Sequence, residues 1–287
     1  MKVILALVIG FGWIMAPTDP LVEVGTFATG SPPPLSEQIR IVSYNLHGPF
    51  AKRIDDIKQV LTTHPALTHA AVFALQEVNR QRKETAYRDM ARELAEMLDV
   101  HYAFAVENSY PDKDGGGVRG LALLSRYPMS DVERTLLPVP GPGGRRRILL
   151  GATVHLGTER LRVYTTHLET RISVEQRAQQ IKAIIDQLER YRGMPTLVLG
   201  DFNTITEGAR KKMFELMQAA GFSCPMPGNK ATFQRLQILR LKLDWIWVRH
   251  VNATKAAVET EVTASDHRPI WVDVKLTDKP TADTATR

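Results

Sequence analysis

The segment Thr196–Asn203 (TLVLGDFN) constrains the fold more than any other stretch of the chain. Its apolar run, Leu197–Leu199, is typical of a buried strand, and Gly200 then leads to Asp201 and Asn203 just past the strand's end. A carboxylate and a carboxamide at the mouth of a packed sheet must stay hydrogen-bonded or hydrated, which costs stability. An Asx-type turn would explain this motif taken alone. The same order of strand and polar residue recurs along the chain, however, and that favours a functional explanation.

Polar side chains stand at the ends of four expected strands and at the beginnings of two others. These residues are Asn45, Glu77, His167, Asp201 and Asn203 at strand ends, and Asp244, Asp266 and His267 at strand beginnings. The end of one strand lies beside the start of its antiparallel neighbour. We therefore expect one edge of the structure to collect carboxylates, imidazoles and carboxamides.

The rest of the chain alternates expected strands with amphipathic helices. The expected strands are 41–44, 72–75, 102–106, 120–124, 148–155, 161–166, 243–248 and 270–274, and the expected helices are 55–63, 87–98, about 174–190 and 210–220. With 287 residues the chain has room for one large domain or two small ones, and it shows no internal repeat. We predict an α/β (α+β) fold in which two mostly antiparallel sheets pack face to face and are flanked by helices.

The two ends of the chain differ from the middle. Residues 1–17 carry Lys2 and an apolar run, Val3–Ala16, which is short for a membrane span and typical of a secretory signal. An N-terminal membrane anchor or a buried helix is the alternative. Residues 18–37 contain three consecutive prolines and are expected to be a linker, 38–277 the folded domain, and 278–287 a polar tail. We expect a secreted or periplasmic protein, or alternatively one anchored by its N-terminal segment.

The ordered set of motifs resembles the endonuclease/exonuclease/phosphatase family, which includes deoxyribonuclease I. The matching pieces are SYNLHG, LQEV, GLALLSRYP, THLE, GDFN, LDWIWV and SDHRPI, and they span roughly residues 41 to 274. The resemblance implies a four-layered α/β sandwich with its site along one edge. It also implies a metal-dependent hydrolase of phosphate esters.

The residue types suit that chemistry. Hydrolysis of a phosphate ester requires neutralisation of developing negative charge and delivery of a water in line with the leaving group. Mg²⁺ prefers oxygen ligands and takes only one or two protein carboxylates. We expect Glu77 to bind Mg²⁺ directly, with Asn45 close by, and Asp266 to complete the site or hold a second ion. Mn²⁺ is the expected substitute, and the sequence is compatible with either one or two bound ions. No Cys/His cluster has the spacing of a zinc site.

The other polar residues have candidate catalytic roles. His267 and Asp244 are expected to pair as an imidazole oriented by a carboxylate, which could activate water or face the phosphate in its protonated form. Asp201 competes for the role of positioning the water. His167 and Asn203 are expected to donate hydrogen bonds to the non-bridging phosphate oxygens.

Four more residues have expected positions. Arg119, just after a glycine-rich loop, is a candidate phosphate contact or a structural residue, and Arg126 is expected to brace the fold. Trp245 and Trp247 are expected to pack against a layer of the sandwich. Because the one cysteine is Cys224, no intrachain disulfide can form.

The net charge of +6 and the pI near 9.4 favour a polyanionic partner. We expect three basic clusters, Arg145–Arg147, Arg210–Lys212, and Arg235 with Arg240 and Lys242, to bind backbone phosphates without reading sequence, although solvated surface charge is the alternative for each. His167 in its THLE setting resembles the deoxyribonuclease and sphingomyelinase branches. The predicted function is therefore a monomeric nuclease. The alternatives are a phospholipid phosphodiesterase in transient contact with a membrane, an inositol or sugar phosphatase, and a catalytically silent binding protein.

Overall fold

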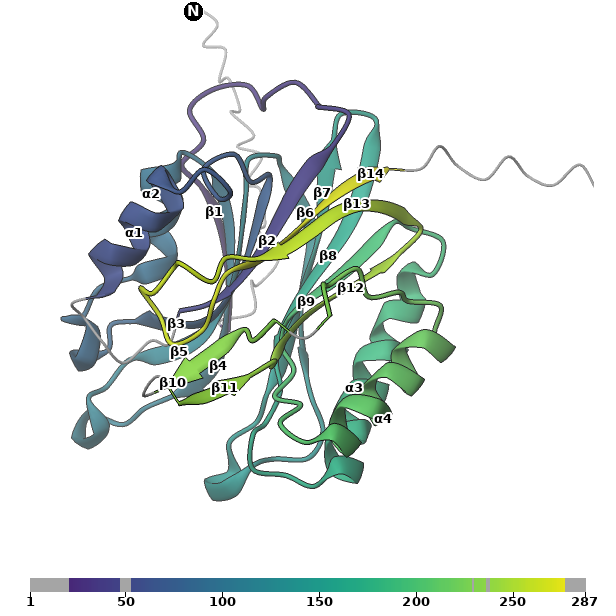
Figure 1. Cartoon of the computed structure of the whole chain (residues 1–287). Coiled ribbons are helices and arrows are strands. Elements are labelled where there is room, and N and C mark those ends of the chain that lie inside the picture. The colour runs from purple at the N-terminus through teal and green to yellow at the C-terminus, as the bar shows by residue number, and fades with distance from the viewer. Residues whose placement is uncertain (1–20, 47–52, 229, 236–237, 277–287) are drawn as a thin grey trace, which may run out of the picture.

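The computed structural model describes residues 21–46, 53–228, 230–235 and 238–276, and it contains two sheets that face each other (Figure 1). The larger sheet has the order β1-β4-β5-β3-β2-β14-β13. Its strands are β1 (Val22–Thr26), β2 (Ile39–Asn45), β3 (Val72–Arg80), β4 (His101–Ser109), β5 (Val118–Ser125), β13 (Val251–Val258) and β14 (Ile270–Leu276). The smaller sheet has the order β12-β9-β8-β7-β6. Its strands are β6 (Met129–Leu136), β7 (Ile148–Leu156), β8 (Glu159–His167), β9 (Thr196–Asp201) and β12 (Asp244–Arg249).

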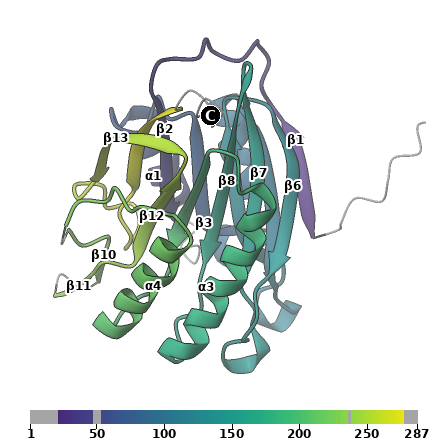
Figure 2. The same ribbon diagram turned by 90° about the vertical axis from the view of Figure 1, so that its right-hand side faces the viewer.

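Helices cover the outer face of each sheet. Helices α1 (Arg53–Thr63) and α2 (Met90–Leu98) pack on the larger sheet (Figure 1). Helices α3 (Val174–Leu188) and α4 (Glu207–Ala219) pack on the smaller one (Figure 2). The remaining short elements are the 3₁₀ turns Lys83–Thr85, Asp112–Asp114, Pro142–Gly144 and Glu189–Tyr191, and the strand pair β10 (Phe233–Arg235) and β11 (Leu239–Leu241). This confirms the predicted four-layered sandwich of two mostly antiparallel sheets flanked by helices.

Side-chain alternation along each strand separates the apolar cores. On β12, Ile246 and Val248 enter the core between the two sheets, while Trp245 and Trp247 face α3 and α4. Phe214 of α4 packs edge-on against both indoles, with ring centroids 5.2 and 4.8 Å apart. The expected packing of the two tryptophans is therefore confirmed.

Strand register brings the predicted polar residues together. Strand β9 lies between β8, which is parallel to it, and β12, which is antiparallel. Asp201 at the end of β9 is consequently level with His167 at the end of β8 and with Asp244 at the start of β12. Strands β2 and β3 are also parallel, which places Asn45 level with Gln76. Parallel neighbours thus align strand ends directly, in addition to the antiparallel pairing that the sequence predicted.

The expected linker at 18–37 needs a correction, because part of it is a strand. Strand β1 pairs antiparallel with β4 at the edge of the larger sheet, from Val22 opposite Ala105 to Thr26 opposite His101. Its half-exposed side chains lack a clear apolar pattern, so its position depends on backbone pairing with β4. The edge strands β6 and β13 were not predicted either, because their half-exposed side chains also lack a clear apolar pattern.

The predicted signal or anchor at 1–17 and the tail at 278–287 lie outside the described residues. Within the described ranges, no helix is both long and apolar enough to cross a membrane. Arg126 braces the fold as expected, because its guanidinium donates to the backbone carbonyls of Ala70 and Thr68 at 3.0 and 2.6 Å.

Candidate active site

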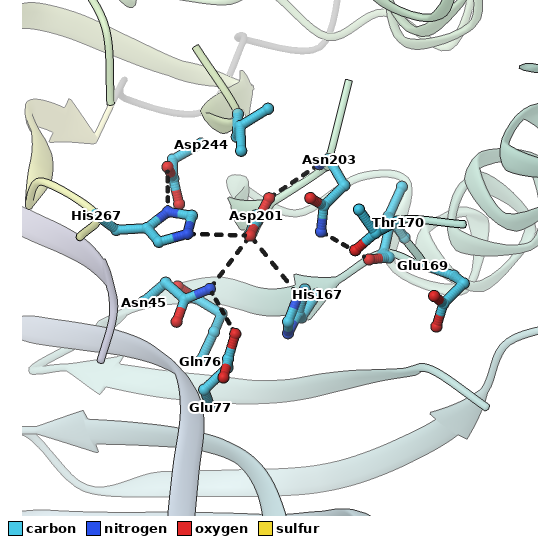
Figure 3. A network of polar contacts seen from close by, with 12 residues as sticks. Asn45, Gln76, Glu77, His167, Glu169, Thr170, Asp201, Asn203, Asp244 and His267 are labelled. Atoms are coloured by element: carbon cyan, nitrogen blue, oxygen red, sulfur yellow. Dashed lines mark hydrogen bonds and ion pairs between the residues drawn. The ribbon is translucent and has the colours of Figure 1, made fainter. Parts of the chain in front are cut away.

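Asp201 is the centre of a buried polar cluster at one edge of the sandwich (Figure 3). Gly200 delivers it there, because φ is +142° at this residue and a Cβ would lie 2.0 Å from the carbonyl oxygen of Thr166. The Oδ1 atom of Asp201 accepts the backbone N–H of Asn203 at 2.9 Å. Its Oδ2 atom accepts Asn45 Nδ2 at 3.2 Å.

Two imidazoles flank the same oxygen of Asp201. The Nε2 atoms of His167 and His267 lie 3.6 and 3.7 Å from Asp201 Oδ2, and all three side chains are buried. Burial and the neighbouring Asp244 carboxylate raise the pKa of Asp201 to about 7. A carboxyl group with that pKa is suited to take up a proton near neutral pH.

Asp244 holds His267 from the other side, as the sequence predicted for this pair. His267 Nδ1 lies 2.8 Å from Asp244 Oδ2, and the ring of Phe233 packs against the imidazole at 5.0 Å. Burial by itself would lower the pKa of His267, but the Asp244 carboxylate reverses this and raises it to about 10. His267 is therefore an imidazolium with a fixed ring orientation at neutral pH.

Glu77 reaches the cluster through a distortion of β3. The pairing of β3 with β5 shifts register between Leu75 and Val78, and Glu77 has φ +54° in this bulge. A bulge re-aims a side chain that a regular strand would direct elsewhere, and a residue at positive φ carries backbone strain. Asn45 Nδ2 lies 3.4 Å from Glu77 Oε1 and so links Glu77 to Asp201. The bulge therefore directs the Glu77 carboxylate toward the polar cluster around Asp201.

Ser265 connects the last predicted metal residue to this group. Its hydroxyl contacts Asp266 Oδ1 at 3.4 Å and donates to the backbone oxygen of Asn45 at 2.9 Å.

Asn203, at φ +49°, donates one amide hydrogen to the carbonyl of Leu168 at 2.9 Å. Its NH₂ group carries a second hydrogen that can be donated. All eight predicted strand-end residues thus belong to this edge of the sandwich.

Arg119 lies beside Glu77 and has several protein partners. Its guanidinium contacts Glu77 Oε2 at 3.2 Å, Glu84 Oε1 at 2.8 Å and Asn79 Oδ1 at 2.9 Å. These contacts orient the Glu77 carboxylate. The predicted contact of Arg119 with a substrate phosphate stays a prediction.

Arg147 corrects the prediction of an exposed Arg145–Arg147 cluster. Arg145 and Arg146 are exposed, but Arg147 is buried and pairs with the buried carboxylates of Glu107 and Glu169, each at 3.0 Å. The burial of Arg147 could have been inferred from its position directly before the apolar residues of β7, which begins at Ile148. Neither Glu107 nor Glu169 was predicted to have a role, although Glu169 belongs to the THLE motif.

Arg147 also determines the tautomer of His167. Its Nη1 atom lies 3.1 Å from His167 Nδ1, and a guanidinium can only donate hydrogen bonds. His167 must therefore accept at Nδ1 and carry its proton on Nε2, which faces Asp201. Burial and the Arg147 cation both lower the pKa of His167 well below its ordinary value. The cluster thus holds one neutral imidazole and one charged imidazole.

Replacement of Arg147 by methionine should destabilise the protein strongly. The substitution leaves Glu107 and Glu169 buried without their cation, and loss of one partner of a buried ion pair costs about 3–5 kcal/mol. The free energy of unfolding in urea measures this loss. Arg146→Met, at the exposed neighbouring position, is the matched control and should change it by less than about 1 kcal/mol. Equal stabilities for the two variants would contradict the assigned network.

The donor set fits a divalent cation. Glu77, Asp201 and Asp244 bring carboxylates close together, and the charges of Asp244 and Glu77 both raise the pKa of Asp201. Carboxylate oxygens of Asp201 and Asp244 lie within 4.8 Å of each other and of a ring nitrogen of His267, and because His267 is protonated, these oxygens are the atoms that a cation could bind. A cation bound here would relieve the repulsion between the carboxylates.

The fold and this edge define the class of the protein: an α/β/β/α sandwich with a carboxylate- and histidine-lined site at one edge. A sequence profile of the endonuclease/exonuclease/phosphatase family matches residues 42–267, and the chain belongs to this family. It is accordingly a phosphoester hydrolase, and the family is generally dependent on divalent metals.

Solved structures share the fold at low sequence identity. An endonuclease/exonuclease/phosphatase from Beutenbergia cavernae is 21% identical with a TM-score of 0.69, and the match covers 86% of this chain and 74% of that one. The human Nocturnin catalytic domain with bound sulfate is 18% identical with a TM-score of 0.61, covering 91% and 100%. D. rerio TDP2 with a single-strand DNA product is 19% identical with a TM-score of 0.59, covering 83% and 99%. None of the curated proteins compared with the chain matches it.

Proposed function

We propose that this protein is a Mg²⁺-dependent phosphodiesterase that cleaves nucleic acid. The observation that carries the proposal is the position of Asp201, whose Oδ2 atom lies between the Nε2 atoms of His167 and His267. The Asp201 carboxylate and the two imidazoles therefore lie close enough together to act on one phosphate group. Glu77 and Asn45 lie directly beside them.

Glu77 and Asn45, with Asp266 close by, would hold Mg²⁺, and the ion would neutralise charge on the phosphate oxygens when bound. Asp201, with its raised pKa, accepts the proton of the attacking water. The charged His267, oriented by Asp244, and the neutral Nε2–H of His167 face the negative charge that develops on the phosphate oxygens. The second amide hydrogen of Asn203 can contribute to the same contact.

Charge and fold relatives favour nucleic acid as the substrate. Arg145 and Arg146 are exposed near the site, on the segment that leads to Arg147, and Arg147 contacts His167. Cations in such positions bind backbone phosphates without reading the base sequence. Among the structures with this fold, TDP2 is described with a single-strand DNA product and Nocturnin with a sulfate anion.

A side-by-side activity panel tests the proposal. We expect the purified chain to cleave plasmid DNA or RNA with Mg²⁺ or Mn²⁺, and the chelator EDTA to abolish cleavage. Asp201→Asn is the control against a contaminating nuclease, and it should lower the rate on the order of a hundredfold or more because it removes the proposed base. Sphingomyelin and inositol phosphates complete the panel. Hydrolysis of these alone, with DNA and RNA left intact, would contradict the nuclease proposal.

One observation favours a phospholipid phosphodiesterase as the second candidate. Ile238, just before β11, and Leu239, the first residue of β11, are 86% and 47% exposed. Exposed apolar side chains on a protein surface can enter a lipid interface. The sphingomyelin arm of the panel tests this candidate directly.

A further inference from the structure

A hollow of about 470 Å³ lies between the start of α4 and strand β12, next to the catalytic edge. The volume is in the range of ligand-binding pockets, roughly 300–1,000 Å³. Three apolar side chains form its floor: Phe214, Met226 and Trp245. Three cations and one carboxylate line its rim: Arg210, Lys211, Lys242 and Glu207. The hollow is thus apolar inside and positively charged at its entrance.

Lys242 holds a fixed position at this rim. Its Nζ atom donates to the backbone carbonyls of Pro227 and Gly228 at 2.8 and 2.6 Å, and these acceptors are neutral. The same atom lies 4.4 Å from the centroid of the Trp245 ring, so it is held above the apolar floor. An anionic group that enters the hollow meets a fixed cation.

The fold brings Lys242 to the same hollow as two cations that precede it by about thirty positions in the sequence. Helix α4, which carries Arg210 and Lys211, follows β9, and Lys242 precedes β12. Because β9 and β12 are antiparallel, the end of β9 meets the start of β12, and the three cations line one hollow there. In the remaining basic cluster, Arg145–Arg147, the last arginine is buried.

The hollow and the catalytic cluster occupy the two faces of one strand end. Asp244 faces His267, and the next residue, Trp245, faces α4, because successive side chains of a strand alternate. Trp245 Nε1 also donates to Thr204 Oγ1 at 3.0 Å, and Thr204 follows Asn203 in the chain. A polymer that leaves the catalytic cluster toward the hollow must pass the start of β12, where Lys242 lies.

We propose that this hollow is an accessory binding site for the nucleic-acid strand and takes a nucleotide that flanks the scissile phosphate. The backbone phosphate lies against Arg210, Lys211 and Lys242, and the base lies over the apolar floor. A cationic rim with apolar and aromatic surface is the combination that binds single strands without sequence preference. The inference rests on the proposed function and adds to it the path of the substrate strand.

Cys224 provides a test that does not need activity. It is the one cysteine of the chain and it lines the hollow. We expect a ten-residue oligothymidylate, added with EDTA to prevent cleavage, to slow the reaction of the Cys224 thiol with dithiobis(nitrobenzoate) about fivefold or more. The double variant Arg210→Glu/Lys211→Glu should lose this protection. Lys212→Glu is the matched control, because Lys212 is the next residue on α4, pairs with Glu215 at 3.2 Å and does not line the hollow.

A kinetic arm separates this inference from the proposed function. The double variant should raise KM for an oligonucleotide about tenfold at low salt, while kcat/KM for the small diester bis(4-nitrophenyl) phosphate stays unchanged. Cleavage of oligonucleotides without protection of Cys224, or equal effects of Lys212→Glu and the double variant, would overturn the accessory site and leave the nuclease standing. Protection of Cys224 in a chain that cleaves no nucleic acid would support the site and overturn the nuclease.

Discussion

Glu77→Gln should lower Mg²⁺-dependent hydrolysis by roughly a thousandfold while the protein stays folded. The change keeps the size of the side chain and its contact with Asn45 but removes the anionic ligand proposed for Mg²⁺. A charge-stabilising group at a phosphoryl-transfer site contributes about 3–4 kcal/mol, which corresponds to that factor. The measurement is the initial rate on DNA as a function of Mg²⁺ concentration. Wild-type activity in the variant at saturating Mg²⁺ would refute the assignment of Glu77.

Glu84→Gln is the matched control for this experiment. Glu84 binds the same arginine as Glu77, since Arg119 Nη2 lies 2.8 Å from Glu84 Oε1. The control therefore also removes a negative partner of Arg119, but it does so away from Asn45 and Asp201. We expect less than about a threefold change in rate. The comparison separates the loss of a metal ligand from the loss of an ion pair.

Asp244→Asn should lower the rate by about a thousandfold or more with little change in KM. The carboxylate fixes the orientation of His267 and stabilises its charged form, and the loss of such a partner elsewhere costs a catalytic histidine several orders of magnitude. Single-turnover kinetics on an oligonucleotide measures the step directly. A variant that loses substrate affinity but keeps the chemical rate would contradict the positioning role.

The pH dependence of stability supplies a second readout for Asp244. Since the folded-state pKa of His267 is raised to about 10, its contribution to stability is complete below about pH 6.5 and is lost as the pH rises toward 10. The variant lacks the carboxylate that raises this pKa, so its unfolding free energy should vary less between pH 6.5 and 10. Parallel wild-type and variant profiles over this range would contradict the pairing.

The residues that make up the buried polar cluster around Asp201 can be predicted from features that are visible in the sequence. An apolar strand that ends in a polar residue has few alternatives in a packed sheet, because the polar group must lie at an edge. Asn45, His167 and Asp201 were predicted from this rule alone. The register of β8 and β9 aligns His167 with Asp201, and the facing sheet brings Asn45 to the same edge. Strand alternation likewise predicted that Trp245 and Trp247 pack against a layer.

Three features depended on contacts between distant segments. Strand β1 forms by pairing with β4, and its own residues carry no strong pattern. The bulge that directs Glu77 into the site is a mismatch between β3 and β5, and no local signal specifies it. Burial of Arg147 depends on Glu107 and Glu169, which lie 40 and 22 residues away.

The sequence by itself determined the fold class and the set of polar residues at strand ends and beginnings, because hydrophobic periodicity and strand boundaries are local properties of the chain. Its ordered motifs, by their resemblance, indicated the family. The tertiary structure alone decided which charges face each other. It made Arg147, the last arginine of one predicted basic loop, a buried support for His167, and it placed Lys242 at the same hollow as Arg210 and Lys211. Electrostatic interactions depend on distance and burial in space, and neither quantity is encoded in any short stretch of residues.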